Sequence, residues 1–152
     1  MAKFKFVVDN CVRHLQSVLP ARQTVQLEEI GLNGLSGDDE IVEVASAQNL
    51  LIVTNNGHHF QQGVIARIAE SRKGEHGCTQ VNGLVIVVPS DAIVQKRVLA
   101  AAAKNLIFEG KKIGWKTVFE QCLMVVIGAS GPPKITRLPR CPWCKFEYPK
   151  AS

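Results

Sequence analysis

Two short apolar segments constrain the fold of this chain more than any other feature. Residues 50–53 (LLIV) and 84–88 (LVIVV) contain no polar side chain. Such a strand is typical of a parallel sheet covered on both faces, whereas a strand with one face in water alternates apolar and polar residues. Residues 3–8 (KFKFVV) alternate lysine with phenylalanine at their start, and we expect a strand that ends at Asp9.

Segments with helical spacing lie between and after these strands. We expect helices over residues 10–19, 36–48, 59–72 and 90–107. Pro20 closes the first of them. Ser36 and Asp39 form a capping-box pattern at the start of the second. Ser90 or Asp91 caps the last.

The remaining segments complete an α/β pattern. Residues 24–32 are expected to begin as a short strand, and residues 122–139 to form a strand, a Gly/Pro turn and a second strand. This alternation predicts an α/β fold with a central, mostly parallel sheet flanked by helices. At 152 residues, the chain fits one domain, expected over residues 1–140, with a C-terminal tail over residues 141–152.

The composition indicates a cytoplasmic protein without a membrane partner. No apolar run approaches the roughly 18–20 residues that a membrane-spanning helix needs. The first apolar stretch, residues 6–8, is cut by Asp9 and is too short for a signal peptide. Five cysteines, an odd number, do not match the disulfide framework of a small secreted protein.

Charged side chains are unevenly distributed along the chain. Residues 1–60 carry 4 basic and 7 acidic side chains, whereas residues 104–152 carry 9 basic and 3 acidic ones. A basic half attracts polyanions, and an acidic half could hold a cation. The basic side chains that could follow an RNA backbone are Lys111, Lys112, Lys116, Lys134, Arg137 and Arg140. Alternatively, they form a solvated helix face and a hairpin edge protected by charge.

Polar side chains follow the first and third expected strands. Asp9 ends the first, residues 54–59 (TNNGHH) follow the third, and acidic residues 38–40 open the helix between them. Because the carboxyl ends of parallel strands meet at one edge, these groups could converge there. Carboxylates around a divalent cation can bind a scissile phosphate and activate a water. Alternatively, Asn56 and Gly57 only form a turn, and the acids only favour the helix start.

Three of these segments together resemble the PIN-like domain family. They are FVVDNCVRHL, EEIGLNGLSGDDEIVEVA and LLIVTNNGHHF, which span about the first 60 residues. The chain is most similar to small bacterial members associated with toxin–antitoxin pairs of the VapBC kind. The resemblance implies a three-layer fold and a metal-dependent endoribonuclease. It also implies RNA as substrate, and often a small antitoxin protein as partner and a homodimer.

The resemblance also assigns the site residues. Asp9 matches the first metal-binding acid, Asp38 the helix-start acid, and Thr54 the threonine that orients the site. Asn56 stands where many members have Asp, and His59 stands where many have Asp, Glu or His. The implied cofactor is Mg²⁺ or Mn²⁺, held by the two carboxylates together with the amide and the imidazole. The histidine and the smaller number of acids favour Mn²⁺.

Two other functions compete with an active nuclease. One is a catalytically weakened PIN-like module that binds RNA or a partner protein. The other is a phospho-accepting receiver domain, in which the first strand also ends in acidic residues. Receivers carry their phosphorylated Asp after the third strand, where this chain has Thr54 and Asn55, so the sequence disfavours that alternative.

The C-terminal tail contains an isolated CPWC motif. Cys141 and Cys144 have the spacing of a zinc knuckle, but a structural zinc site needs four ligands and no second pair follows. His76 and Cys78, or another subunit, could supply the missing ligands. A remnant of such a site or a plain tail is the preferred interpretation.

Overall fold

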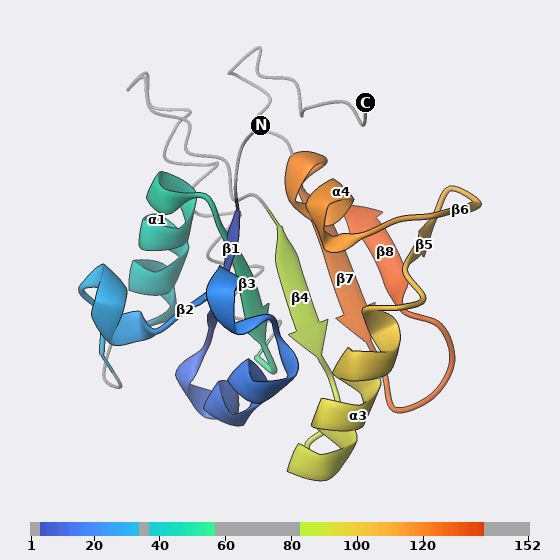
Figure 1. Cartoon of the computed structure of the whole chain (residues 1–152), viewed down its shortest axis with the longest axis horizontal. Helices are drawn as coiled ribbons and strands as arrows, with labels where there is room; N and C mark the ends of the chain where they lie inside the picture. The colour runs from blue at the N-terminus through green and yellow to red at the C-terminus, as the bar shows by residue number, and fades with distance from the viewer. Residues whose placement is uncertain (1–3, 34–36, 57–82, 139–152) are drawn as a thin grey trace.

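A six-stranded sheet forms the centre of the computed structural model, which describes residues 4–33, 37–56 and 83–138 (Figure 1). The strand order is β2-β1-β3-β4-β7-β8, and only β8 is antiparallel to its neighbour. The strands are β1 Lys5–Val8, β2 Thr24–Val25, β3 Leu50–Thr54, β4 Leu84–Val87, β7 Leu123–Ile127 and β8 Lys134–Arg137. The prediction of an α/β fold with a mostly parallel central sheet is therefore confirmed.

Within the described residues, helical segments lie between β1 and β2, between β2 and β3, and between β4 and β7. Three are 3-10 helices: η1 Asn10–Val18, η2 Ala21–Gln23 and η3 Leu27–Ile30. Three are α-helices: α1 Asp38–Gln48, α3 Ala92–Ala102 and α4 Trp115–Glu120. A two-stranded hairpin, β5 Ile107–Phe108 and β6 Lys111–Lys112, lies between α3 and α4. None of the described helices is long and apolar enough to cross a membrane.

Apolar side chains pack against both faces of the sheet. Phe6 and Val8 of β1 belong to one buried cluster, which includes residues of η1, α3 and α4. The residue between them, Val7, belongs to a second cluster, which includes residues of η3 and α1. Since side chains alternate along a strand, the two clusters lie on opposite faces. All residues of β3 and β4 are buried, as their apolar sequences predicted, but Val88, expected within the second of these strands, follows β4 and is 53% exposed.

Several expected element boundaries were wrong. Residues 10–18 form a 3-10 helix with a kink at Val12, where φ is −133°, instead of an α-helix. The short strand expected at the start of residues 24–32 is confirmed as β2, but η3 follows it instead of a loop, since the Glu29 side chain accepts from Gln26 N at 3.1 Å. The N-cap of α1 is Gly37 instead of Ser36, since the Glu40 carboxylate accepts from Gly37 N at 3.3 Å.

Other expectations have mixed outcomes. Asp91 caps α3, as predicted, because its Oδ2 accepts from Val94 N at 3.0 Å, but the helix ends at Ala102 instead of residue 107. The strand, turn and strand expected within residues 122–139 are β7 and β8. The β5–β6 hairpin and α4 were not predicted. The helix expected over residues 59–72 and the tail lie outside the described residues.

The strand order contains a switch point between β1 and β3. β2 lies on one side of β1 and β3 lies on its other side, so the direction of the connections reverses between β1 and β3. In open α/β sheets, ligands bind outside the carboxyl ends of the strands at such a switch point. Asp9 and Thr54 are at the carboxyl ends of these two strands.

Candidate functional site

Asp9 is held at the end of β1 by its backbone and by its side chain. Its N–H donates to Val53 O of β3 at 2.9 Å. Its Oδ1 accepts from Asn10 N at 2.8 Å, which caps the first turn of η1. Only 6% of the residue is exposed. The carboxylate is therefore fixed by the sheet and is not carried by a mobile loop.

The second oxygen of this carboxylate accepts two further hydrogen bonds. Thr54 Oγ1 donates to Asp9 Oδ2 at 3.0 Å, and Cys11 Sγ donates to the same oxygen at 2.9 Å. Thr54 is fully buried, and its hydroxyl oxygen accepts from Asn56 N at 2.9 Å. A carboxylate offers about four acceptor positions, so three donors leave roughly one of them for another ligand. Thr54 lies where it can orient Asp9.

Cys11 is the residue at this site that the sequence analysis missed. Partial burial of the thiol, followed by its hydrogen bond to Asp9 and the charge of that carboxylate, raises the pKa of Cys11 to about 11. The thiol therefore stays protonated at neutral pH and serves as a hydrogen-bond donor. Its position two residues after Asp9, in the first turn of η1, is the signal that could have indicated it.

The segment before α1 reaches the same edge of the sheet. Asn10 Nδ2 donates to Asn33 O at 3.1 Å, and Arg13 Nε donates to Asn10 Oδ1 at 2.9 Å. Arg13 also pairs with Glu28, and this hydrogen bond lowers the pKa of the Glu28 carboxyl below its usual value. These contacts connect η3 and the following segment to η1, directly beside Asp9.

The predicted ligand Asp38 is the first residue of α1. Only Asn49 separates the end of α1 from β3, so the helix runs antiparallel to that strand and begins toward the edge where β3 ends (Figure 1). The backbone of Asp38 therefore lies toward the carboxyl ends of β1 and β3, where Asp9 and Thr54 are. Its side chain and the whole of His59 lie outside what the structure describes. Their roles stay predictions.

The two asparagines after Thr54 have different positions. Asn56 is exposed, and its predicted role as a ligand stays a prediction. Asn55 Nδ2 donates to three carbonyl oxygens at the end of β4. These are Val87 O at 2.7 Å, Val88 O at 3.2 Å and Pro89 O at 3.1 Å. Asn55 therefore joins the ends of β3 and β4.

A hydrogen-bonded chain continues from this point to η1. Gln95 of α3 is buried, and its Nε2 donates to Pro89 O at 2.6 Å. His14 Nε2 is 2.6 Å from Gln95 Oε1, so this ring nitrogen carries the proton that the amide oxygen accepts. Hydrogen bonds thereby link the ends of β3 and β4 to α3 and η1.

The described residues by themselves do not form a metal site. Among them, no group of three or more His, Cys, Asp and Glu side chains could hold a metal ion. Asp9 contributes one carboxylate, and Thr54 contributes a hydroxyl beside it. Mg²⁺ and Mn²⁺ prefer several oxygen ligands. Binding of either cation therefore depends on groups beyond this pair, and it stays a prediction.

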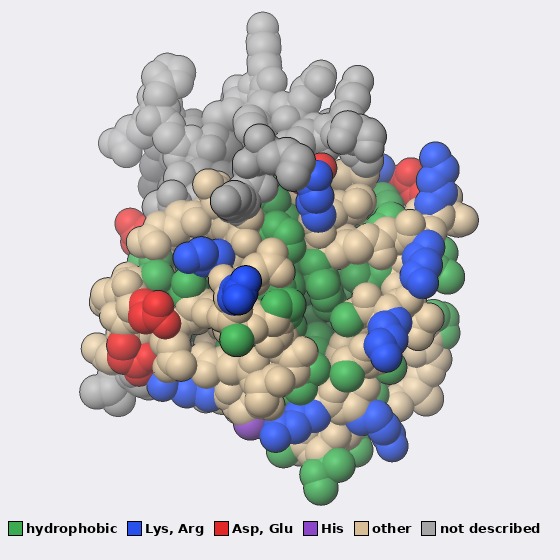
Figure 2. Space-filling view, in the orientation of Figure 1, with side chains coloured by type: hydrophobic (Ala, Val, Ile, Leu, Met, Phe, Trp, Pro, Cys, Tyr) green, Lys and Arg blue, Asp and Glu red, His purple; other side chains and the backbone are tan. Residues whose placement is uncertain are grey.

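The basic side chains late in the sequence gather on one side of the molecule. Figure 2 shows Lys and Arg along the edge with β5, β6 and α3, while several acidic side chains lie on the side of α1. Lys111, Lys112 and Lys134 are exposed. Arg137 is 2.8 Å from Glu109 Oε1 and lies over the Phe108 ring, with its Cζ 5.0 Å from the centroid.

The remaining late residues are paired or not described. Lys116 Nζ lies 3.6 Å from Glu120 Oε1, one helical turn away. Arg140, Cys141 and Cys144 lie outside the described residues, as do the other predicted zinc ligands. The alternatives left open for the tail therefore stay open.

Comparisons with protein-family models, with curated proteins and with solved structures find no match for this chain.

Proposed function

We propose that this chain is a metal-dependent endoribonuclease of the PIN-like type, with three layers around the central sheet. The observation that carries the proposal is the position of Asp9. It is a buried carboxylate at the end of a central parallel strand, beside the switch in strand order, with its orientation fixed by Thr54. Apolar clusters on both faces of the sheet support the layered arrangement.

In this proposal, Asp9, Asp38, Asn56 and His59 hold Mg²⁺ or Mn²⁺ and Thr54 positions Asp9. A divalent cation in such a site polarises the scissile phosphate and lowers the pKa of an attacking water. Thr54 donates to Asp9 Oδ2 and so holds the orientation of the carboxylate, in which roughly one acceptor position would remain for the cation. The buried setting of Asp9 excludes part of the water that would weaken its hold on a cation.

The resemblance extends the proposal to partners. RNA is the substrate, the cytoplasm is the place of action, and a small antitoxin protein and a second copy of the chain are the candidate partners. The exposed Lys111, Lys112 and Lys134 support an interaction with a polyanion.

The deciding experiment is RNA cleavage by Asp9→Asn, with Mn²⁺ and with Mg²⁺. Asn preserves the shape of the side chain and can still cap η1, but it removes the negative charge. Cleavage should be lost with both metals, and the wild type should cleave faster with Mn²⁺. Asp91→Asn is the matched control, because Asp91 also follows a strand end and caps a helix. That variant should cleave like the wild type.

Thermal unfolding of the same variants separates a site from a scaffold. Asn has one acceptor oxygen and an amino group in place of the two oxygens of Asp9, so it cannot accept from Asn10 N and also from Thr54 and Cys11, and a loss of about 1–2 kcal/mol in unfolding free energy is expected. Cleavage must therefore be measured well below the melting temperature of Asp9→Asn. Metal-dependent cleavage that survives in the folded variant would remove Asp9 from the mechanism.

A second candidate function is favoured by the hydrogen bonds that the Asp9 carboxylate already accepts. Three donors already satisfy most of its acceptor capacity, and the described residues bring no second carboxylate to it. This arrangement suits a catalytically weakened PIN-like module that binds RNA or a partner protein. Wild-type protein that binds RNA but cleaves none with Mn²⁺ or Mg²⁺ would favour this second function.

A further inference from the structure

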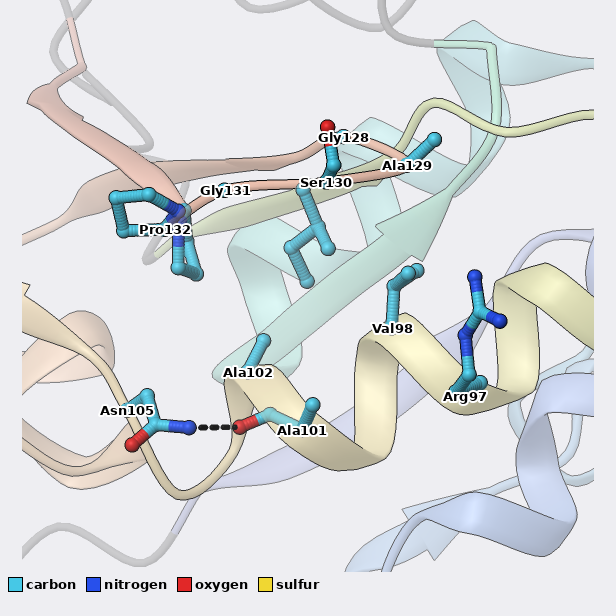
Figure 3. A pocket seen from close by; sticks show the side chains of 12 residues that line it. Arg97, Val98, Ala101, Ala102, Asn105, Gly128, Ala129, Ser130, Gly131 and Pro132 are labelled. Carbon is cyan, nitrogen blue, oxygen red and sulfur yellow. Dashed lines mark hydrogen bonds between the residues drawn. The ribbon is translucent and has the colours of Figure 1, made fainter.

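A cavity of about 530 Å³ lies between α3 and the loop that connects β7 to β8 (Figure 3). Sites for small ligands commonly have volumes of about 300–1,000 Å³. The cavity is separate from Asp9 and Thr54, since neither residue lines it. Its lining residues are all in segments that the structure describes, 97–105 and 127–133.

The walls of this cavity are mostly apolar. One wall consists of small side chains on α3 and the other of the end of β7 and the prolines after it; together they are Val98, Ala101, Ala102, Ile127, Pro132 and Pro133. Alanines on the helix leave room that larger side chains would fill. Gly131, with a φ of +81°, lets the connecting loop turn back over the cavity. The result is a slot with two apolar sides.

One end of the slot carries a positive charge. Arg97 is exposed and makes no ion pair or hydrogen bond with any described residue. Figure 3 shows its side chain rising from α3 toward the level of the loop. At the other end, Asn105 Nδ2 donates to Ala101 O at 3.1 Å. The loop also has backbone N–H groups available: those of Ala129, Ser130 and Gly131 donate to no described residue.

The slot and Asp9 lie on the same edge of the sheet. Val8 pairs with Val53, Thr54 with Ile86, and Val87 with Ile127, so β1, β3, β4 and β7 end within about one residue of each other. Neighbouring strands are about 4.8 Å apart, so the end of β7 is about 14 Å from the end of β1. A strand of RNA that crosses this edge can reach both places.

We infer that the slot binds one nucleotide of a single-stranded RNA, with its base between α3 and the loop and its phosphate at Arg97. The inference rests on the proposed function, because it takes RNA as the substrate. An apolar slot can bury the faces of a base, and a guanidinium that pairs with no described residue complements a phosphate. Basic side chains on this side of the molecule, seen in Figure 2, attract the same polyanion.

The test measures binding of a short, fluorescently labelled single-stranded RNA in the presence of EDTA, so that cleavage plays no part. Ala101→Leu fills the slot with a good helix former and should weaken binding about tenfold. Arg97→Ala should weaken binding and reduce the slope of log K against log salt by about 0.7. Ala100→Leu and Lys96→Ala are the matched controls, since both residues are exposed on α3 and do not line the slot. In both control variants, the part of the RNA affinity that comes from the slot should be unchanged.

A second probe isolates the base. An oligomer of abasic ribose phosphates should bind the wild type and Ala101→Leu equally, because only a base can occupy the slot. Equal binding of the normal RNA to the wild type, Ala101→Leu and Arg97→Ala would overturn the inference, even if Asp9-dependent cleavage were found. Weaker binding confined to the two slot variants would support it, even if no variant cleaved RNA.

Discussion

At the scale of single residues, burial and the contact with Asp9 together set the pKa of the Cys11 thiol. The sulfur is 2.9 Å from Asp9 Oδ2, and burial and this carboxylate together raise the pKa of Cys11 to about 11 from an ordinary value of 9.0. The fold thus favours the protonated thiol. The stabilisation is fully present below pH 9 and is lost as the pH rises through about 11.

This shift predicts slow alkylation of Cys11 although the residue is exposed. At pH 8, iodoacetamide should modify Cys11 about a hundredfold more slowly than in the unfolded chain, because the thiolate fraction is lower. Asp9→Asn should accelerate the reaction by less than this factor, since burial is the larger cause of the shift. Peptide mass spectrometry measures each cysteine separately. Cys122, buried with a pKa raised to about 12 by burial, is the control that should stay slow in both proteins.

An unchanged alkylation rate for Cys11 in Asp9→Asn would contradict the hydrogen bond between the two side chains. A rate for the wild type equal to that of the unfolded chain would contradict the raised pKa itself.

At the scale of elements, β4 depends on a glycine at its start. Gly83 has a φ of +144°, and a Cβ at this position would lie 2.2 Å from Leu51 Cδ1 of β3. Leu51 is fully buried, so its side chain has little room to move. Gly110, in the β5–β6 turn, has a φ of +77° and no atom within 4 Å of the same position.

These two glycines make a matched pair. Gly83→Ala should lower the free energy of unfolding by about 2–4 kcal/mol, because backbone strain and overpacking add. Gly110→Ala should cost about 1–2 kcal/mol, from the backbone conformation alone. Urea unfolding of both variants measures the difference. Equal losses would mean that the contact with Leu51 does not limit how β4 packs on β3.

At the scale of the whole molecule, charged side chains are unevenly distributed. Figure 2 shows Lys and Arg side chains along the side of β5, β6 and α3, and acidic side chains interspersed with basic ones on the side of α1. Lys111 and Lys112 are exposed neighbours on β6. An RNA strand that passes this edge would release counterions, which makes its binding sensitive to salt.

The double substitution Lys111→Ala, Lys112→Ala tests the basic edge. RNA affinity should fall, and the slope of log K against log salt should decrease by about 1.4 if each lysine neutralises one phosphate. Arg22→Ala is the control, because Arg22 is exposed on η2, at the other end of the sheet beside β2. A slope that changes equally in both proteins would show a general charge effect and no specific RNA path.

The sequence by itself determined the class of fold and the position of Asp9 at the end of a strand. Residues 50–53 and 84–88 predict strands covered on both faces, because an unbroken apolar run can only be stable where water is excluded on each side. The alternation before Asp9 likewise predicts a carboxylate at a strand end. Both are local patterns, and local patterns report burial reliably.

Tertiary structure alone decided which polar groups meet. The contact of Thr54 with Asp9 joins residues 45 positions apart, and the strand order that makes it a switch point is not encoded in any short segment. The same holds for the bond of Asn55 to the end of β4 and for the slot between α3 and the β7–β8 loop. Register and strand order depend on how all the apolar surfaces of the chain pack together, so they emerge only when the whole core forms.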